Sequence, residues 1–356
     1  MPSKFKVAVA QVNPITFDMK ACVSKVCDYV DIAADKGAEV VVFGEMCIGG
    51  YPAWRPHILK YGDDTFFQKE SEWPSKNLFK ISETIPGPSI EKLSKKAKDQ
   101  NVFIITGFAE SDPKLTGTIY NTAVIIGRDG SIIGKHRKLH IGSLELAYWK
   151  KGDIDDVKVF QTPLAKFGLA ICYDCLFPEY TRLLDLMGEE IQCQRYATSA
   201  GYEVFSNCYP LARAMEGGVF VLSSCLVGKD ELTGFEYAGE SQIVDPFGRI
   251  LAKAKPGAED IILAELNLDQ ILDYRASGSF TLGMDRREDI YSTTTLQCNN
   301  SQLRQRLPLQ RLDWQFQIRT RLLKNLEEKL DQADMIPRTH GITEVTTCSR
   351  TSTNSS

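Results

Sequence analysis

The stretch KVAVAQVNPITFDMKACVSKVCDYVDIAADKGAEVVVFGE, residues 6–45, decides the fold. Residues 6–12 form a short run rich in β-branched side chains that stops at Asn-Pro, as a strand does before a turn. Residues 19–36 carry apolar side chains at helical spacing and end at a glycine. Residues 39–45 then have the pattern of a fully buried strand. This β-α-β beginning predicts a layered α/β fold.

Hairpin patterns add antiparallel strands to this beginning. TIYNTAVIIGRDGSIIGKHRK, residues 118–138, contains two strand-like runs joined by a turn at 128–130, and SQIVDPFGRILAKA, residues 241–254, repeats the pattern around 246–248. The second half of the chain follows the same strand, helix, strand and hairpin order as the first. The mixture of β-α-β units and hairpins predicts mixed sheets rather than purely parallel ones.

Composition places the chain among ordinary globular proteins. Its 356 residues are 43% hydrophobic and 25% charged, which is enough to bury a sizeable core. The net charge of −4 has no basic stripe, so nucleic acids and anionic membranes are poor candidates for partners. Neither a secretion signal nor an apolar run of transmembrane length occurs. We therefore expect a cytoplasmic protein.

The ten cysteines are scattered along the chain and do not form the paired C-x-x-C pattern of a zinc site. Cys172 and Cys175 make a single C-x-x-C, without a second pair or a nearby histidine to complete four ligands. A thioredoxin-like redox pair has the same spacing, although such pairs usually open a helix after a first strand. We expect no metal and interpret most of these thiols as small buried hydrophobic groups.

Three functional side chains end or interrupt strand-like stretches: Glu45 in FGE, Lys138 in HRK and Cys172 in ICYD. Each alone has an ordinary explanation, respectively a solvated strand end, an exposed basic turn and a packed core cysteine. Together they supply what a thiol nucleophile needs, because a thiol attacks only as the thiolate and requires a base and a nearby cation. A cation and a backbone N–H can also stabilise the negative charge that develops on a nitrile nitrogen or carbonyl oxygen.

Seven segments surround these side chains and keep one order along the chain. They are VAVAQVNP (7–14), VVFGEMCIGGYPAW (41–54), IPGPSIEKLSKKAK (85–98), LTGTIYNTAVIIGRDGSIIGKHRKL (115–139), GLAICYDCLFPEYTRLL (168–184), ARAMEGGVFVLSS (212–224) and GESQIVDPFGRIL (239–251). With them, the chain resembles the nitrilase, or carbon–nitrogen hydrolase, superfamily from about Lys6 to Asp269. The resemblance implies that Glu45 is the general base, Lys138 the cation at the tetrahedral intermediate and Cys172 the nucleophile.

The same resemblance implies further features. Glu145 follows Lys138 by seven residues, the family position of a glutamate that orients the lysine and the substrate, although within SLELAYW alone it would be an exposed loop acid. The backbone N–H of Tyr173 would be a second donor to the developing charge. The implied fold is α/β, a four-layer αββα sandwich with mixed sheets. The family needs neither a cofactor nor a metal, and its dimers pack helix against helix to extend the sandwich.

The branch of the superfamily is harder to assign. GYPAW at 50–54, the long aromatic insertion after it, HRKL and the long C-terminal extension look like true nitrilases. Cys172-Tyr173-Asp174 and Phe177-Pro178-Glu179 look instead like amidases and carbamoylases, since true nitrilases commonly have Cys-Trp-Glu. Gly44 stands where the family usually has proline, and His140-Ile141-Gly142 replaces the usual nitrilase Pro-Thr. These departures concern the substrate rather than the chemistry.

We therefore predict a nitrilase that hydrolyses a small nitrile to a carboxylic acid and ammonia through a cysteine thioimidate and thioester. The alternative is an amidase or N-carbamoyl amide hydrolase with the same Glu-Lys-Cys triad. A third hypothesis, an inactive self-assembling or binding protein, is disfavoured because the triad and Glu145 are all present. Tyr51, Trp54 and Tyr173 are candidate aromatic walls for a small apolar substrate, or plain packing.

Three regions are expected. Residues 1–285 form the hydrolase domain, and residues 286–336 an extension in which Trp314, Ile318, Leu322, Leu326 and Leu330 recur at four-residue steps of a helix that contacts a subunit. Residues 337–356 are polar and Ser/Thr-rich, as in a disordered tail. The resemblance implies a homo-oligomer, a dimer with the extension supporting a spiral filament. His57 and His136 are not needed by the mechanism, and we predict structural roles for them.

Overall fold

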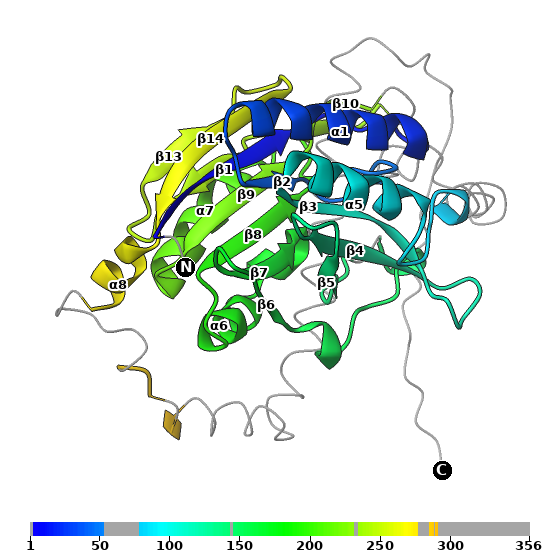
Figure 1. Cartoon of the computed structure of the whole chain (residues 1–356). Coiled ribbons are helices and arrows are strands. Elements are labelled where there is room, and N and C mark those ends of the chain that lie inside the picture. Colours follow the sequence, from blue (N-terminus) through cyan, green and yellow to red (C-terminus); the bar gives the residue numbers. More distant parts are fainter. Residues whose placement is uncertain are drawn as a thin grey trace, which may run out of the picture. The chain divides into compact units, whose positions relative to one another are not determined.

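Two six-stranded sheets form the centre of the computed structural model, which describes residues 3–52, 78–142, 145–230, 234–276, 285–287 and 289–290 (Figure 1). The strands of the first sheet are β1 (Lys4–Gln11), β2 (Val40–Phe43), β3 (Phe103–Ser111), β4 (Ile119–Ile126), β5 (Ile132–Arg137) and β14 (Asp260–Asn267). Those of the second are β6 (Val159–Gln161), β7 (Lys166–Ile171), β8 (Ile191–Tyr196), β9 (Phe220–Cys225), β12 (Gln242–Val244) and β13 (Ile250–Lys253). A small antiparallel pair, β10 (Val227–Lys229) and β11 (Glu236–Ala238), follows β9 and precedes β12 in sequence.

The two sheets have the same internal order. The first runs β14-β1-β2-β3-β4-β5 and the second β6-β7-β8-β9-β12-β13. In each, three parallel strands lie next to one another, with an antiparallel strand at one edge and an antiparallel hairpin at the other. The prediction of mixed sheets built from a repeated strand, helix, strand and hairpin order is therefore confirmed.

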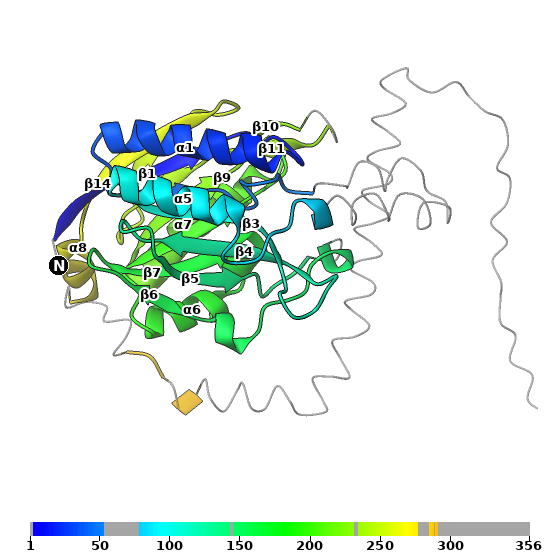
Figure 2. The ribbon, with the colours of Figure 1, turned by 45° about the vertical axis from the view of Figure 1, so that its right-hand side comes forward.

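The sheets pack face to face and each is covered by helices on its outer face. Val7 and Val9 of β1 belong to the same apolar core as Phe167 and Leu169 of β7, whereas their neighbours on the other face of β1 pack with the helices. Helices α1 (Met19–Asp35) and α5 (Pro88–Gln100) cover the first sheet. Helices α6 (Pro178–Leu186) and α7 (Glu203–Gly217) cover the second, and Figure 2 shows α1 and α6 on opposite sides of the sheets. The expected αββα sandwich is confirmed.

Burial on both faces explains why these strands read as continuous apolar runs. Successive side chains of a strand point to opposite faces of its sheet, so a strand between a helix layer and a second sheet must be apolar at every position. All four residues of β2, Val40–Phe43, are fully buried. The short helix α8 (Asp269–Arg275) follows β14.

Several predicted features fall outside the described residues. They are most of the aromatic insertion after Gly49, the helical stripe from Trp314 to Leu330, and the tail from residue 337. None of the helices in the described part of the chain is both long enough and apolar enough to cross a membrane.

A buried pair of carboxyl groups, Asp185 near the end of α6 and Glu189 before β8, lies under the helix layer. Glycines make room for it: a Cβ on Gly168 would lie 1.6 Å from Glu189 Oε2, and one on Gly217 would lie 2.1 Å from Asp185 Oδ1. Burial raises the pKa of both carboxyls, and the charge of Asp185 raises that of Glu189 further. Two buried carboxylates this close repel each other, so we expect the native pair to keep one proton.

This shared proton predicts a pH-dependent stability. The native pair keeps a proton that the unfolded chain releases above the ordinary carboxyl pKa, so stability is full below that pKa and falls as the pH rises toward the raised native pKa. The slope is about 1 kcal/mol per pH unit for one proton. Glu189→Gln supplies an amide N–H in place of the proton and keeps an acceptor for Gln192 Nε2, 2.7 Å away. We expect the variant to lose most of this slope in urea unfolding at pH 5, 7 and 9.

The neighbouring Glu190 provides the matched control. Its carboxylate accepts the backbone N–H of Lys166 at 2.9 Å and is not part of the pair. Glu190→Gln should leave the pH slope of wild type in place. Parallel stability curves for wild type and Glu189→Gln would show that no proton is shared.

Candidate active site

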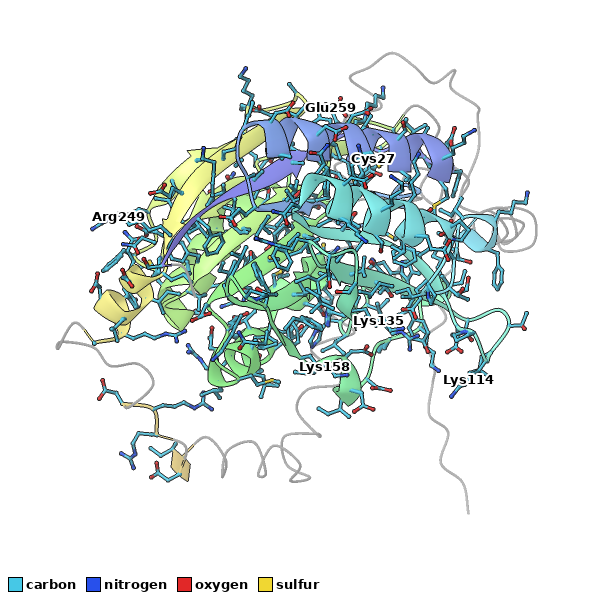
Figure 3. All side chains as sticks on the ribbon, in the orientation of Figure 1. Cys27, Lys114, Lys135, Lys158, Arg249 and Glu259 are labelled. Atoms are coloured by element: carbon cyan, nitrogen blue, oxygen red, sulfur yellow. The ribbon has the colours of Figure 1, made fainter. Side chains whose placement is uncertain are left out.

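The predicted site residues lie where strands of both sheets end. Glu45 comes two residues after β2 and Lys138 directly after β5 in the first sheet, and Cys172 comes directly after β7 in the second. Figure 3 labels Lys135 on β5, three residues before Lys138. Side chains at strand ends are held by a rigid scaffold, which suits groups that must keep fixed distances.

Lys138 joins two glutamates in a buried ion cluster. Its Nζ lies 2.7 Å from Glu45 Oε1, and 2.8 and 3.1 Å from the two carboxylate oxygens of Glu145. Glu45 is 0% and Lys138 1% exposed. Burial alone would lower the pKa of Lys138, but the charges of Glu145 and Glu45 raise it well above its usual value. The cluster therefore holds a permanent ammonium at the strand ends.

Two further donors hold Glu45. Asn121 Nδ2 donates to its Oε1 at 2.8 Å, and the backbone N–H of Ala197, just after β8, donates to its Oε2 at 3.1 Å. Burial raises the pKa of Glu45, and Lys138 opposes that shift. A Cβ on Gly44 would lie 2.9 Å from Leu226 Cδ2, which explains why the position before the glutamate holds glycine here.

Glu145 faces the cluster from the first turn of the short 3-10 helix Glu145–Ala147. Besides Lys138, it accepts the backbone N–H of Gly142 at 2.9 Å. This bond orients the Glu145 carboxylate, which binds the Lys138 ammonium. The predicted spacing of seven residues thus brings Glu145 and Lys138 into direct contact, and the alternative of an exposed loop acid is wrong.

Cys172 occupies a strained position beside this cluster. It opens the 3-10 helix Cys172–Leu176 with φ +49°, a left-handed conformation that residues with a Cβ rarely adopt. The residue is partly exposed, whereas Ile171 before it is fully buried. Burial and the charge of Glu45 raise the pKa of the Cys172 thiol, and Lys138 lowers it. A thiol whose pKa is raised needs a base to become the nucleophilic thiolate.

The second cysteine of the C-x-x-C pair has a different environment. Cys175 is fully buried among the side chains under α6, and burial raises the pKa of its thiol to about 12, which is the reverse of a reactive redox cysteine. All eight cysteines in the described part of the chain are free thiols. Among the described residues, no three His, Cys, Asp or Glu side chains are grouped so that they could hold a metal ion.

Two of the three aromatic candidates lie next to the cluster. The ring centroid of Tyr51 is 6.0 Å from Lys138 Nζ, and Tyr51 is anchored through its carbonyl, which accepts from Tyr237 Oη at 3.0 Å. Tyr173, beside Cys172, is 37% exposed and meets the ring of Phe177 edge-on at 5.0 Å. Trp54 lies outside the described residues, as does His57.

Three groups around the site were given no role in it from the sequence. Asn121 interrupts the apolar stretch IYNTAVII, and Asp174 follows the cysteine within ICYD; both are fully buried polar side chains. In the sequence, the only sign of these two residues was a polar side chain within or directly after an apolar run. The donor from Ala197 is a backbone group, for which the side-chain sequence carries no signal.

Comparison with known proteins identifies the family of the chain. Residues 6–276 match the carbon–nitrogen hydrolase family. Nitrilase 3 of Arabidopsis thaliana is 32% identical over 311 residues, covering 82% of this chain and 87% of that protein. The omega-amidase NIT2 of Xenopus tropicalis is 28% identical over 305 residues, covering 82% and 98%. The crystal structure of Nit3 from Saccharomyces cerevisiae, a member of branch 10 of the nitrilase superfamily, has a TM-score of 0.64 at 27% identity, covering 78% of this chain and 95% of that one.

The ion cluster makes a prediction about stability. Lys138→Met leaves the carboxylates of Glu45 and Glu145 buried without their cation, which should cost about 3–5 kcal/mol of unfolding free energy at pH 8. The cost should shrink at pH 5, because removing the lysine raises the pKa of Glu45 further and lets it bind a proton. Urea unfolding at the two pH values measures both effects.

Lys135→Met is the matched control, since Lys135 lies on β5, three residues before Lys138, with a side chain 34% exposed. Its partner Glu110 keeps two hydrogen bonds from Arg137, at 2.9 and 2.6 Å. This control should lose less than about 1 kcal/mol. Equal losses in the two variants would contradict a special role for the buried cluster.

Proposed function

The chain belongs to the carbon–nitrogen hydrolase family, and on that premise we propose that it is a nitrilase, which converts a small nitrile and water into a carboxylic acid and ammonia. The observation that carries the proposal is the buried Glu45–Lys138–Glu145 cluster beside the partly exposed thiol of Cys172. The resemblance to nitrilases over most of both chains favours the nitrile over other substrates.

In the proposed first stage, Glu45 accepts the proton of the Cys172 thiol as the sulfur attacks the nitrile carbon. One carbon–nitrogen π bond breaks and its electrons move to nitrogen, which takes the proton to give a thioimidate. The Lys138 ammonium stabilises the charge on nitrogen, with the Tyr173 backbone N–H as the second donor. Glu145 keeps Lys138 in place, since its carboxylate contacts the ammonium through both oxygens.

In the second stage, Glu45 activates a water molecule that adds to the thioimidate carbon. Ammonia leaves with the electrons of the carbon–nitrogen bond, and a thioester remains on Cys172. A second water, activated in the same way, displaces the sulfur to give the acid and the free thiol. A buried carboxyl with a raised pKa suits this cycle, because it must accept and return a proton repeatedly near neutral pH.

An amidase or N-carbamoyl amide hydrolase is the alternative. Such an enzyme reaches the same thioester directly, by expelling the amine from a tetrahedral intermediate. Tyr173-Asp174 after the nucleophile and the similarity to an omega-amidase support it. The inactive binding protein is the weaker hypothesis, since all four polar site residues are present and three of them are in contact.

The test compares a small nitrile with its own amide. We expect the purified protein to release ammonia from the nitrile, and Cys172→Ala to lower that rate by at least about 1,000-fold because the covalent step is lost. Cys208→Ala removes an exposed thiol on α7 and serves as the control with unchanged rate. Mass spectrometry of the quenched reaction should find the acyl adduct on the peptide of Cys172. Ammonia from the amide with none from the nitrile would establish the alternative.

We also propose that the chain forms a homodimer through α6 and α7. Leu183, Leu186 and Met187 at the end of α6 are 45%, 48% and 49% exposed, and Val204 and Met215 of α7 are 57% and 48% exposed. Such side chains on neighbouring helices are suited to packing against a second sandwich. The spiral assembly through residues 286–336 and the cytoplasmic location remain predictions.

Leu183→Asp tests this surface by placing a charge within it. We expect light scattering after size exclusion to give half the wild-type mass, with the thermal unfolding of the monomer retained. Leu115→Asp, at a residue 53% exposed in the connection between β3 and β4, is the control that should keep the wild-type mass. A wild-type mass for both variants would exclude α6 from the interface.

A further inference from the structure

One buried carboxylate binds both of the loops that carry the site. Asp174 is fully buried and accepts five hydrogen bonds. Its Oδ1 accepts from the backbone N–H groups of Leu139 and His140 at 3.2 and 2.8 Å, and from His140 Nδ1 at 2.8 Å. Its Oδ2 accepts from the backbone N–H of Ile171 at 3.2 Å and from His136 Nε2 at 3.0 Å.

These donors flank the two reacting groups. Ile171 is the last residue of β7 and directly precedes Cys172, so its bond to Asp174 closes the turn in which the cysteine takes φ +49°. His136, Leu139 and His140 lie on either side of Lys138. A single carboxylate therefore links the end of β5 in one sheet to the end of β7 in the other.

His136 lies between two acceptors, one of which is Asp174. His136 Nδ1 lies 3.0 Å from the carbonyl oxygen of Asp156, and its Nε2 lies 3.0 Å from Asp174. Burial alone would raise the pKa of Asp174, but the hydrogen bonds from His136 and His140 hold it well below its usual range.

The second histidine connects the carboxylate to the aromatic surface beside the nucleophile. The ring of His140 stacks on Phe177 with centroids 3.8 Å apart and planes 13° apart, and Phe177 in turn contacts Tyr173. His140 thus makes two separable contacts, a ring stack and an N–H donated to Asp174. That separation allows each to be removed alone.

We propose that Asp174 is a positioning residue, which fixes the Lys138 ammonium and the Cys172 thiol relative to each other through the donors on His136, His140 and Ile171. The inference deepens the function proposed above and rests on it. A displacement of about 1 Å between reacting groups can cost about 100-fold in rate, so a carboxylate that ties both loops governs the chemical step without touching the substrate.

The principal test is Asp174→Asn, which keeps the shape and places an amide N–H against groups that donate. We expect kcat to fall about 100-fold with little change in KM. We also measure alkylation of Cys172 by iodoacetamide against pH, followed by peptide mass. Because Lys138 favours the thiolate, looser positioning should move this profile to higher pH. Asp153→Asn, the cap of the nearby 3-10 helix Ile154–Asp156, controls for general damage and should leave the profile in place.

Two variants of His140 separate positioning from packing. His140→Asn keeps a side-chain donor near the position of Nδ1 and removes the stack, whereas His140→Phe keeps the stack and removes the donor. We expect His140→Asn to retain most of kcat and the wild-type alkylation profile, and His140→Phe to lose about 10-fold with a shifted profile. These variants also decide the question if Asp174→Asn does not fold.

Two results would overturn the proposal. One is a wild-type kcat and alkylation profile in folded Asp174→Asn, and the other is an equal loss in His140→Asn and His140→Phe. The alkylation profile needs no substrate, so failure of the proposed function remains distinguishable. If wild type hydrolyses neither nitrile nor amide, the proposed function fails, while the shift of the Cys172 profile still tests the positioning.

Discussion

The buried ammonium of Lys138 is the constraint on which the rest of the site depends. A charge this deeply buried is tolerated only when opposite charges and hydrogen bonds compensate for the lost water. Here the compensation comes from Glu45 and Glu145, whose carboxylates lie 2.7 and 2.8 Å from the nitrogen. Each glutamate must in turn be held, and the donors that hold Glu45 come from the ends of both sheets. The site is therefore complete only when the two sheets have packed together.

The repeated topology explains how that requirement is met. In each sheet three parallel strands end at the same edge, so groups that follow β2 in the first sheet can meet groups that follow β7 and β8 in the second. Glu45 and the Ala197 backbone N–H show this directly, since they lie 152 positions apart in sequence and 3.1 Å apart in space. Asp174 makes the corresponding link between β7 and β5. Both the ion cluster and the Asp174 carboxylate thus make hydrogen bonds that join the first sheet to the second.

Sequence reasoning succeeded where the signal is local or ordered. Apolar runs and turn residues predicted the strands and hairpins, because each is a property of a few neighbouring residues. The contact of Lys138 with Glu145 was implied by the family resemblance, in which a glutamate follows the lysine by seven residues. For His136 the sequence predicted a structural role but not its partners. Asp156 and Asp174 lie 20 and 38 positions away and are brought to it by packing. No periodicity encodes which buried carboxylate will meet which imidazole.

The same reasoning bears on substrate choice. In the proposed mechanism the ammonium, the base and the thiol serve a nitrile and an amide equally, since both routes pass through one thioester. The routes differ in the first adduct, which is planar for a nitrile and tetrahedral for an amide, and in the group that must leave next. Discrimination therefore depends on the side chains around the carbon under attack rather than on the cluster. Among the described residues, the aromatic side chains next to the proposed reacting groups are Tyr51 beside Lys138, and Tyr173, Phe177 and His140 beside Cys172. His140 also donates to Asp174, so the same residue contacts both the aromatic group beside Cys172 and the carboxylate that binds the cysteine loop.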